Sequence, residues 1–186
     1  MKTVSEKQAV IDELRGDISR SQKKGLHFIM TAVTTWALYT LINFLPLSLG
    51  MRNILCVICA SLFAFFAQIY ARLIRVKFSD PSEPLMPLAL MIALAQMLYI
   101  PISVWAFYVY PEKMLMMIAI VSGAHLLPFA WLYRSKAYLI FSILIPLIAI
   151  VIGWLYPPSV LAPVMLPVSA LFCTLLYLEV KKLHTD

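Results

Sequence analysis

Charged residues are scarce in this chain of 186 residues, making up 13% of it, whereas 62% of the residues are hydrophobic. A soluble domain is typically about a quarter charged and about half apolar. The apolar residues also form long runs, each close to the roughly 20 residues that a helix needs to cross the hydrocarbon of a bilayer. The composition excludes an ordinary soluble domain and predicts an integral membrane protein with several spans.

Side chains that carry familiar chemistry are also few. The middle of each apolar run lacks carboxylates, which argues against an intramembrane aspartyl site and a carboxylate-based metal centre. The three cysteines, Cys56, Cys59 and Cys173, all lie inside apolar runs and imply no disulfide framework. A thiol oxidoreductase needs an accessible thiol of low pKa, so we interpret Cys56 and Cys59 as small packing residues on one helix face. We predict no catalytic residues, no metal and no cofactor, and hence a protein that is not an enzyme.

The net charge of +6 comes from basic residues that sit beside the apolar runs rather than in a cluster of their own. This arrangement argues against nucleic-acid binding and is typical of the signals that orient a membrane protein. Only Arg52 and Lys113 fall on one side of the membrane, and the other lysines and arginines fall on the opposite side. The positive-inside rule then predicts that both termini are cytoplasmic, which requires an even number of spans.

The chain divides into an N-terminal segment, residues 1–25, and a transmembrane domain, residues 26–182. We predict an all-α bundle of six transmembrane helices, separated by prolines and short polar turns. The predicted spans are residues 27–47, 54–71, 88–110, 114–133, 137–156 and 160–178.

Residues 3–24 are predicted to form an amphipathic helix that begins with a capping box between Thr3 and Glu6. Its mixed charges and its length distinguish it from a secretory signal. Two interpretations of this helix are open. It lies on the lipid headgroups, or it contacts a membrane partner or a second copy of the chain through a short coiled coil.

A polar spot is predicted inside the third and fourth spans. His125 lies about eight residues from the inner end of its span, which is roughly 12 Å deep, and Gln96 lies at nearly the same depth in the preceding span. A very short turn joins the two spans, so they should be antiparallel neighbours whose side chains can meet. Ser122 shares a helix face with His125, and Gln68 would extend the patch toward the cytoplasm.

The same residues support two functions. A buried histidine must face protein or a wet cavity. In a cavity, His125 would suit a site that binds or passes a small solute, an ion or a proton. In a dry core, the same side chains would form a polar clasp between helices. Near the inner end of the fourth span, Arg134 and Lys136 would either hold a lipid phosphate or serve as ordinary interface anchors.

The stretch KGLHF at residues 24–28, followed by GAHLLPFAWLYRSKAY at residues 123–138, resembles a family of small bacterial membrane proteins with no assigned function. The resemblance covers residues 23–182. It implies a multi-pass protein of the bacterial cytoplasmic membrane, and it supplies no substrate, mechanism or site residues.

Two classes of function remain open on the sequence. The first is a transporter for a small solute or an ion, with a pocket that faces the cytoplasm. The second is a non-catalytic sensor or subunit of a membrane complex, which uses the N-terminal helix to contact its partner. The expected partners are the lipid bilayer, a small-molecule or ion substrate, and a membrane protein or a second copy of the chain.

Overall fold

The computed structural model describes residues 3–77 and 80–183, and within these ranges all regular structure is helical. The prediction of an all-α protein is confirmed. Three short 3-10 helices, η1 (Lys23–Gly25), η2 (Gln96–Tyr99) and η3 (Pro111–Lys113), connect the α-helices. The α-helices are α1 (Val4–Ser21), α2 (Leu26–Phe44), α3 (Leu49–Ser61), α4 (Phe63–Leu73), α5 (Met86–Ala95), α6 (Ile100–Val109), α7 (Met114–Ala124), α8 (Leu127–Leu132), α9 (Lys136–Leu155) and α10 (Pro158–Lys182).

Five helical segments among the described residues are long and apolar enough to cross a membrane. A sixth candidate arises if α3 and α4, which are bent by 42° at Leu62, count as one span. The five segments are Lys23–Phe44, Met86–Val109, Pro111–Leu132, Lys136–Leu155 and Pro158–Lys182. The chain is therefore a multi-pass helical protein with five to six candidate spans.

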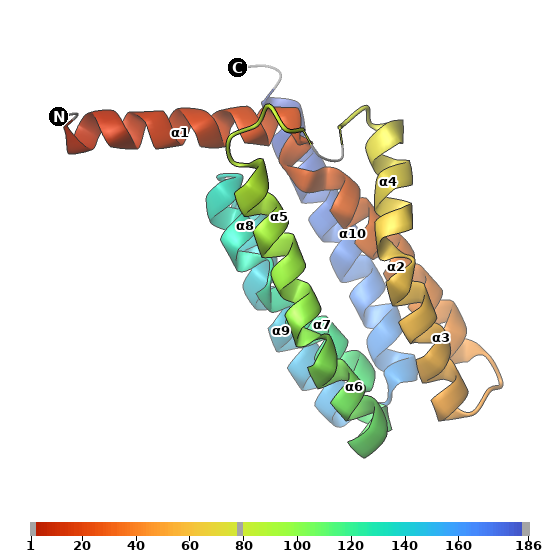
Figure 1. Ribbon diagram of the computed structural model, residues 1–186. Helices are drawn as coiled ribbons and strands as arrows, with labels where there is room; N and C mark the ends of the chain where they lie inside the picture. Colours follow the sequence, from red (N-terminus) through yellow and green to blue (C-terminus); the bar gives the residue numbers. More distant parts are fainter. Residues whose placement is uncertain (1–2, 78–79, 184–186) are drawn as a thin grey trace.

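The N-terminal helix lies crosswise at one end of the bundle (Figure 1). Its first turn is fixed by the predicted capping box, in which the Thr3 hydroxyl accepts from the Glu6 amide and the Glu6 carboxylate accepts from the Thr3 amide. The last turn of α10 reaches the same end (Figure 1). We call this the α1 end of the bundle.

The core forms where α10 packs against α2 and α9, and where α7 packs against α9. Phe141 of α9 and Phe172 of α10 are almost fully buried and stack with ring centroids 4.7 Å apart. Lipid tails are as apolar as these side chains, so close packing rather than water exclusion must hold the helices together.

Two glycines let α7 and α9 approach closely. A Cβ atom on Gly123 would lie 2.5 Å from Cδ of Pro146, and one on Gly153 would lie 2.6 Å from Cγ of Met116. Real Cβ atoms do not come this near to a neighbour. Small residues at such contacts are typical of membrane helices, because they let two backbones approach closely.

The segment made of α5, η2 and α6 is the least buried candidate span, with only 6% of its apolar window inside the protein. It contacts α7 and α8 along one side and runs beside them in Figure 1. Most of its side chains therefore face outward, where lipid would surround them in a membrane.

Candidate functional site

The structure brings together three of the four residues predicted for the polar spot. Nε2 of Gln96 lies 3.5 Å from Oγ of Ser122, which is long for a hydrogen bond. Nδ1 of His125 lies 2.8 Å from the backbone oxygen of Ser122. Because a carbonyl oxygen only accepts, the proton of this bond is on Nδ1. Ser122 thus lies between Gln96 and His125, the two side chains that the sequence placed at nearly the same depth.

On both sides of this group the α-helical hydrogen-bond pattern is interrupted, within spans that each remain one helical segment, Met86–Val109 and Pro111–Leu132. We call these two interruptions the breaks. The third span changes from α5 to the 3-10 helix η2 at Gln96 and resumes as α6 at Ile100. The fourth span ends α7 at Ala124 and resumes as α8 at Leu127. Since η2 contacts α7, the two breaks lie next to each other.

Prolines explain where the helices resume. Pro101 and Pro128 stand in the first turn of α6 and α8, where the missing N–H group has no partner to lose. Pro101 has no N–H group to donate to the carbonyl of Met97, four residues earlier. That carbonyl accepts from the Ile100 amide instead, because the chain tightens into a 3-10 turn.

In the fourth span, the break lies at His125. The Leu126 amide donates to the oxygen of Gly123, at 3.1 Å, rather than to that of Ser122 one residue earlier. The Ser122 oxygen is then available to the imidazole. The His125 side chain therefore caps the end of α7 at the break.

Gln68 does not join this group. Its side chain is exposed on α4, and α4 packs against α2 and α3. Figure 1 places α4 across the bundle from α5, α7 and α8.

A second polar cluster, at the α1 end, was not predicted. Nζ of Lys24 lies 2.9 Å from Oε2 of Glu179, and their side chains are only 7% and 24% exposed. Oε1 of the same carboxylate accepts from the Ala137 amide at 2.9 Å, and the Tyr138 hydroxyl donates to the Lys24 carbonyl at 3.0 Å. This cluster ties η1, α9 and α10 together.

The backbone at this cluster is left-handed over three consecutive residues. Lys23, Lys24 and Gly25 have φ angles of 45°, 50° and 68°, a conformation that costs an ordinary side chain of order 1–2 kcal/mol per residue. Hydrogen bonds from both lysines offset this cost, since Nζ of Lys23 donates to the Ile74 carbonyl at 2.6 Å. The turn sets α1 crosswise to α2.

Trp131 joins α1 to the end of α8. The guanidinium carbon of Arg15 lies 4.5 Å from the centroid of the Trp131 ring, and Nε of Arg15 donates to the Trp131 carbonyl at 2.8 Å. Tryptophan is the best side-chain ring for a cation–π contact, and arginine is the cation most often found over it. The interaction fixes the second half of α1, while residues 3–11 are all exposed.

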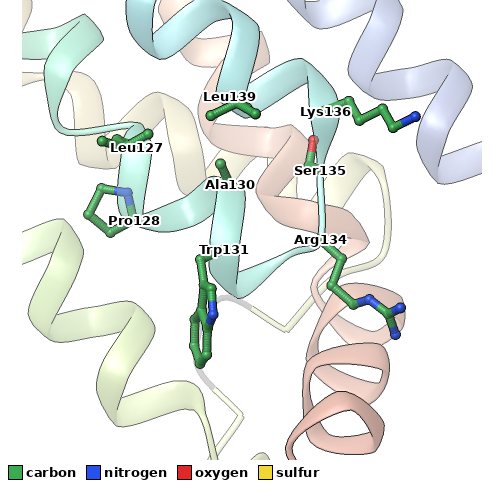
Figure 2. Close-up of a pocket in the computed structure, with 8 residues that line it drawn as sticks. All are labelled: Leu127, Pro128, Ala130, Trp131, Arg134, Ser135, Lys136 and Leu139. Carbon is green, nitrogen blue, oxygen red and sulfur yellow. The ribbon is translucent and has the colours of Figure 1, made fainter.

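An open groove of about 610 Å³ lies beside this contact, between α8 and the start of α9. Figure 2 shows its eight lining residues, with Arg134 and Lys136 extending to one side and Leu127 and Pro128 on the other. The lining residues are Leu127, Pro128, Ala130, Trp131, Arg134, Ser135, Lys136 and Leu139. The two basic residues proposed for lipid contact thus share one groove.

The two basic residues at the opposite end cap helices. Nζ of Lys113 donates to the carbonyls of Gly153 and Trp154 at the end of α9, and Nη1 of Arg52 donates to the Asn43 carbonyl at the end of α2. Cations are favoured at helix C-termini, where carbonyl groups lack partners. Local stabilisation accounts for both residues.

The fold and the membrane-length helices define a multi-pass integral membrane protein. The chain belongs to the DUF7010 family, a family of unknown function, which it matches over residues 11–179. The match includes both breaks, the Lys24–Glu179 cluster and most of α1. It confirms the expected membership in a family without an assigned function. No significant match was found among functionally curated proteins or among solved structures.

Proposed function

We propose that this protein transports a small solute or an ion, and that Gln96, Ser122 and His125 line its path. The observation that carries the proposal is the pair of adjacent helix breaks with these three polar side chains at them. Transporter sites are typically built where membrane helices are discontinuous. Here the groups that a solute could bind at the breaks are the polar side chains of Gln96, Ser122 and His125.

The breaks also lie at the least constrained part of the bundle. The span formed by α5, η2 and α6 is far less buried than its neighbours, so it can shift against α7 without disrupting the core between α2, α9 and α10. Non-helical backbone at membrane depth is tolerated where protein or a wet cavity surrounds it. The 3-10 turn η2 lies against α7, so a path between α7 and this little-buried span satisfies that condition.

His125 supplies the chemistry of the proposed path. With its proton on Nδ1 toward the Ser122 carbonyl, the neutral imidazole presents Nε2 as an acceptor for a solute hydroxyl, an ammonium group or a proton. When Nε2 is protonated, the ring becomes a double donor and favours an anion. The neutral and the protonated imidazole therefore favour different solutes. A transporter that couples solute movement to protons requires such a difference.

Water access to the breaks tests the proposal. The three native cysteines are replaced with serine, the folded state is confirmed, and a single cysteine is placed at Gln96 or at His125. Labelling is then measured from each side of sealed vesicles with a membrane-impermeant thiol reagent. We expect both positions to be labelled, and faster from the side of the α1 end.

The matched control is Ser169→Cys on α10, a small polar residue only 2% exposed. It should stay unlabelled from either side. Ser82→Cys, in the exposed loop before α5, shows that the reagent is active. Rates at positions 96 and 125 as slow as at position 169 would mean a dry clasp and would overturn the proposal.

The proposal includes the orientation of the protein. We take α3 and α4 as one bent span, which gives six spans and places the α1 end in the cytoplasm of a bacterial cell, under the positive-inside rule. Reporter fusions test it: an enzyme active only in the cytoplasm should work when fused after residue 186, and one active only outside should not. The reverse pattern would contradict this orientation.

A second candidate function, a sensor or a subunit of a membrane complex, is favoured by the exposed half of α1. Val4 is 85% exposed and residues 3–11 contact little of the bundle, so this half is available to a protein partner. A photo-crosslinking residue at Val10 tests it in intact membranes. A discrete protein adduct supports a partner, whereas adducts with lipid alone would show that this half lies on the headgroups.

A further inference from the structure

We propose that the groove between α8 and α9 binds the headgroup and one acyl chain of an anionic phospholipid. The site consists of Arg134 and Lys136 for the phosphate, Trp131 beside them, and Leu127, Pro128 and Leu139 for the chain. This inference is independent of the solute path, because it concerns the outer surface of the bundle.

The apolar and the basic residues of the groove lie at different distances from the α1 end of the bundle. Leu127 and Pro128 begin α8, at the end of that helix farther from the α1 end, and Leu139 lies one turn into α9. Arg134 and Lys136 stand at the turn between the two helices, which is the end of the bundle itself. Figure 2 shows Leu127 and Pro128 on one side of the groove and Arg134 and Lys136 extending to the other. An apolar wall that ends in two cations matches a phospholipid, whose chain lies in hydrocarbon and whose phosphate lies at the interface.

The charges of this groove are not used within the protein. No ion pair or side-chain hydrogen bond in the described chain involves the guanidinium of Arg134 or the ammonium of Lys136, and both residues are exposed. Two other lysines at the same end of the bundle do have partners within the protein. Lys24 bonds Glu179 and Lys23 bonds the Ile74 carbonyl. The two groove cations are therefore free to neutralise an anion.

Two amides in the first turn of α9 already have partners, so the side chains of the groove are the main groups left for an anion. The Ser135 hydroxyl accepts from the Tyr138 amide at 3.2 Å, and Glu179 accepts from the Ala137 amide at 2.9 Å. The start of α9 is thus capped from within. The backbone of Arg134 is also held, because its carbonyl accepts a hydrogen bond from Nζ of Lys24 at 3.4 Å.

Arg15 adds a reason why the groove keeps its shape. Its guanidinium stacks on the Trp131 ring and bonds the Trp131 carbonyl. The ring is therefore fixed, although about half of it is exposed. A rigid indole at the interface orders a bound lipid at little further entropic cost.

Native mass spectrometry of the full chain tests the site, after release from nanodiscs that contain equal parts of phosphatidylglycerol and phosphatidylcholine. We expect retained lipid to be enriched in phosphatidylglycerol. A cation close to the lipid phosphate contributes about 1 kcal/mol, roughly a fivefold preference, and this contribution falls off within a Debye length. The double variant Arg134→Gln/Lys136→Gln, which removes both cations of the groove, should therefore reduce the enrichment by on the order of 30-fold. The conservative double variant Arg134→Lys/Lys136→Arg should retain most of it.

The matched control is Arg72→Gln/Lys181→Gln, which removes two exposed cations from the same end of the bundle but outside the groove. It should leave the enrichment unchanged. Equal loss in both double variants would show a diffuse effect of net charge, and no enrichment in the unmodified protein would show that lipid covers the groove without selection. Either result would overturn the proposal.

Discussion

Loss of the Glu179 carboxylate should destabilise the whole α1 end. In Glu179→Gln the side chain keeps its shape and can still accept from the Ala137 amide, but the charge opposite Lys24 is gone. Lys24 cannot turn to water easily, because its side chain is only 7% exposed and its backbone is held left-handed. The variant therefore leaves a cation without a counter-ion.

The magnitude follows from the burial of the pair. Removing one partner of a fully buried ion pair costs about 3–5 kcal/mol. Glu179 is 24% exposed, and Lys24 retains a contact with the Arg134 carbonyl at 3.4 Å, so we expect about 2 kcal/mol after discounting for solvent. In a protein of this size 1 kcal/mol corresponds to about 2–4 °C in Tm, so the expected fall is about 4–8 °C.

Thermal unfolding in one detergent, followed by circular dichroism, measures the change. The matched control is Asp17→Asn, which breaks the Arg20–Asp17 pair at the same 2.9 Å distance but with both side chains about half exposed. Exposed pairs of this kind are worth about 0–1 kcal/mol. If Glu179→Gln shifted Tm no more than Asp17→Asn, the inference that burial makes this pair important would be refuted.

Three further predictions follow from other parts of the structure. Gly123→Ala should lower the free energy of unfolding by about 1–3 kcal/mol, because the new methyl group overpacks against Pro146. Gly50→Ala, with no atom within 4 Å of its Cβ position, should leave the stability unchanged. Equal Tm values for the two variants would contradict this. Arg15→Gln should release α1 and speed amide exchange over residues 12–21, with the spans unchanged; unchanged exchange in α1 would show that Trp131 does not hold it. Hydrogen bonds from the hydroxyl and amide of Ser82, with the nearby Lys77 ammonium, lower the pKa of Asp80 from 3.8 to about 2. Because the folded-state pKa is depressed, this stabilisation is complete above about pH 4 and disappears as the pH falls toward 2. Ser82→Ala should raise the Asp80 pKa in a carboxyl-carbon NMR titration, and an unchanged pKa would contradict the assignment.

The features that the sequence predicted are those encoded by neighbouring residues. The capping box at Thr3 and Glu6 requires only a spacing of three residues, and it forms as expected. Apolar runs of membrane length require no knowledge of the partner helix. Gly123 also signalled a close approach, since a missing side chain permits it regardless of which helix comes near.

The features that the sequence did not predict depend on direction around a helix or on distant pairing. The position of Gln68 along its span is compatible with a place in the polar spot. However, depth does not determine which direction a side chain faces around its helix, and on α4 the Gln68 side chain is exposed. Lys24 and Glu179 are 155 residues apart, and a lone carboxylate among basic residues was the only signal of their pairing. The breaks at Gln96 and His125 arise because prolines start new helices just after them. The sequence alone did not predict this, because the same prolines are also compatible with a kink inside one helix.

Hydrogen–deuterium exchange of the unmodified protein in nanodiscs tests the proposed path most directly, because no substitution disturbs the breaks. We expect the amides of η2 and of residues 125–126 to exchange much faster than those of α9 around Pro146, which lies within one continuous helix. The difference arises because water reaches the breaks and not the core. Exchange at the breaks as slow as in α9 would show a dry interior and would contradict the proposed transport path.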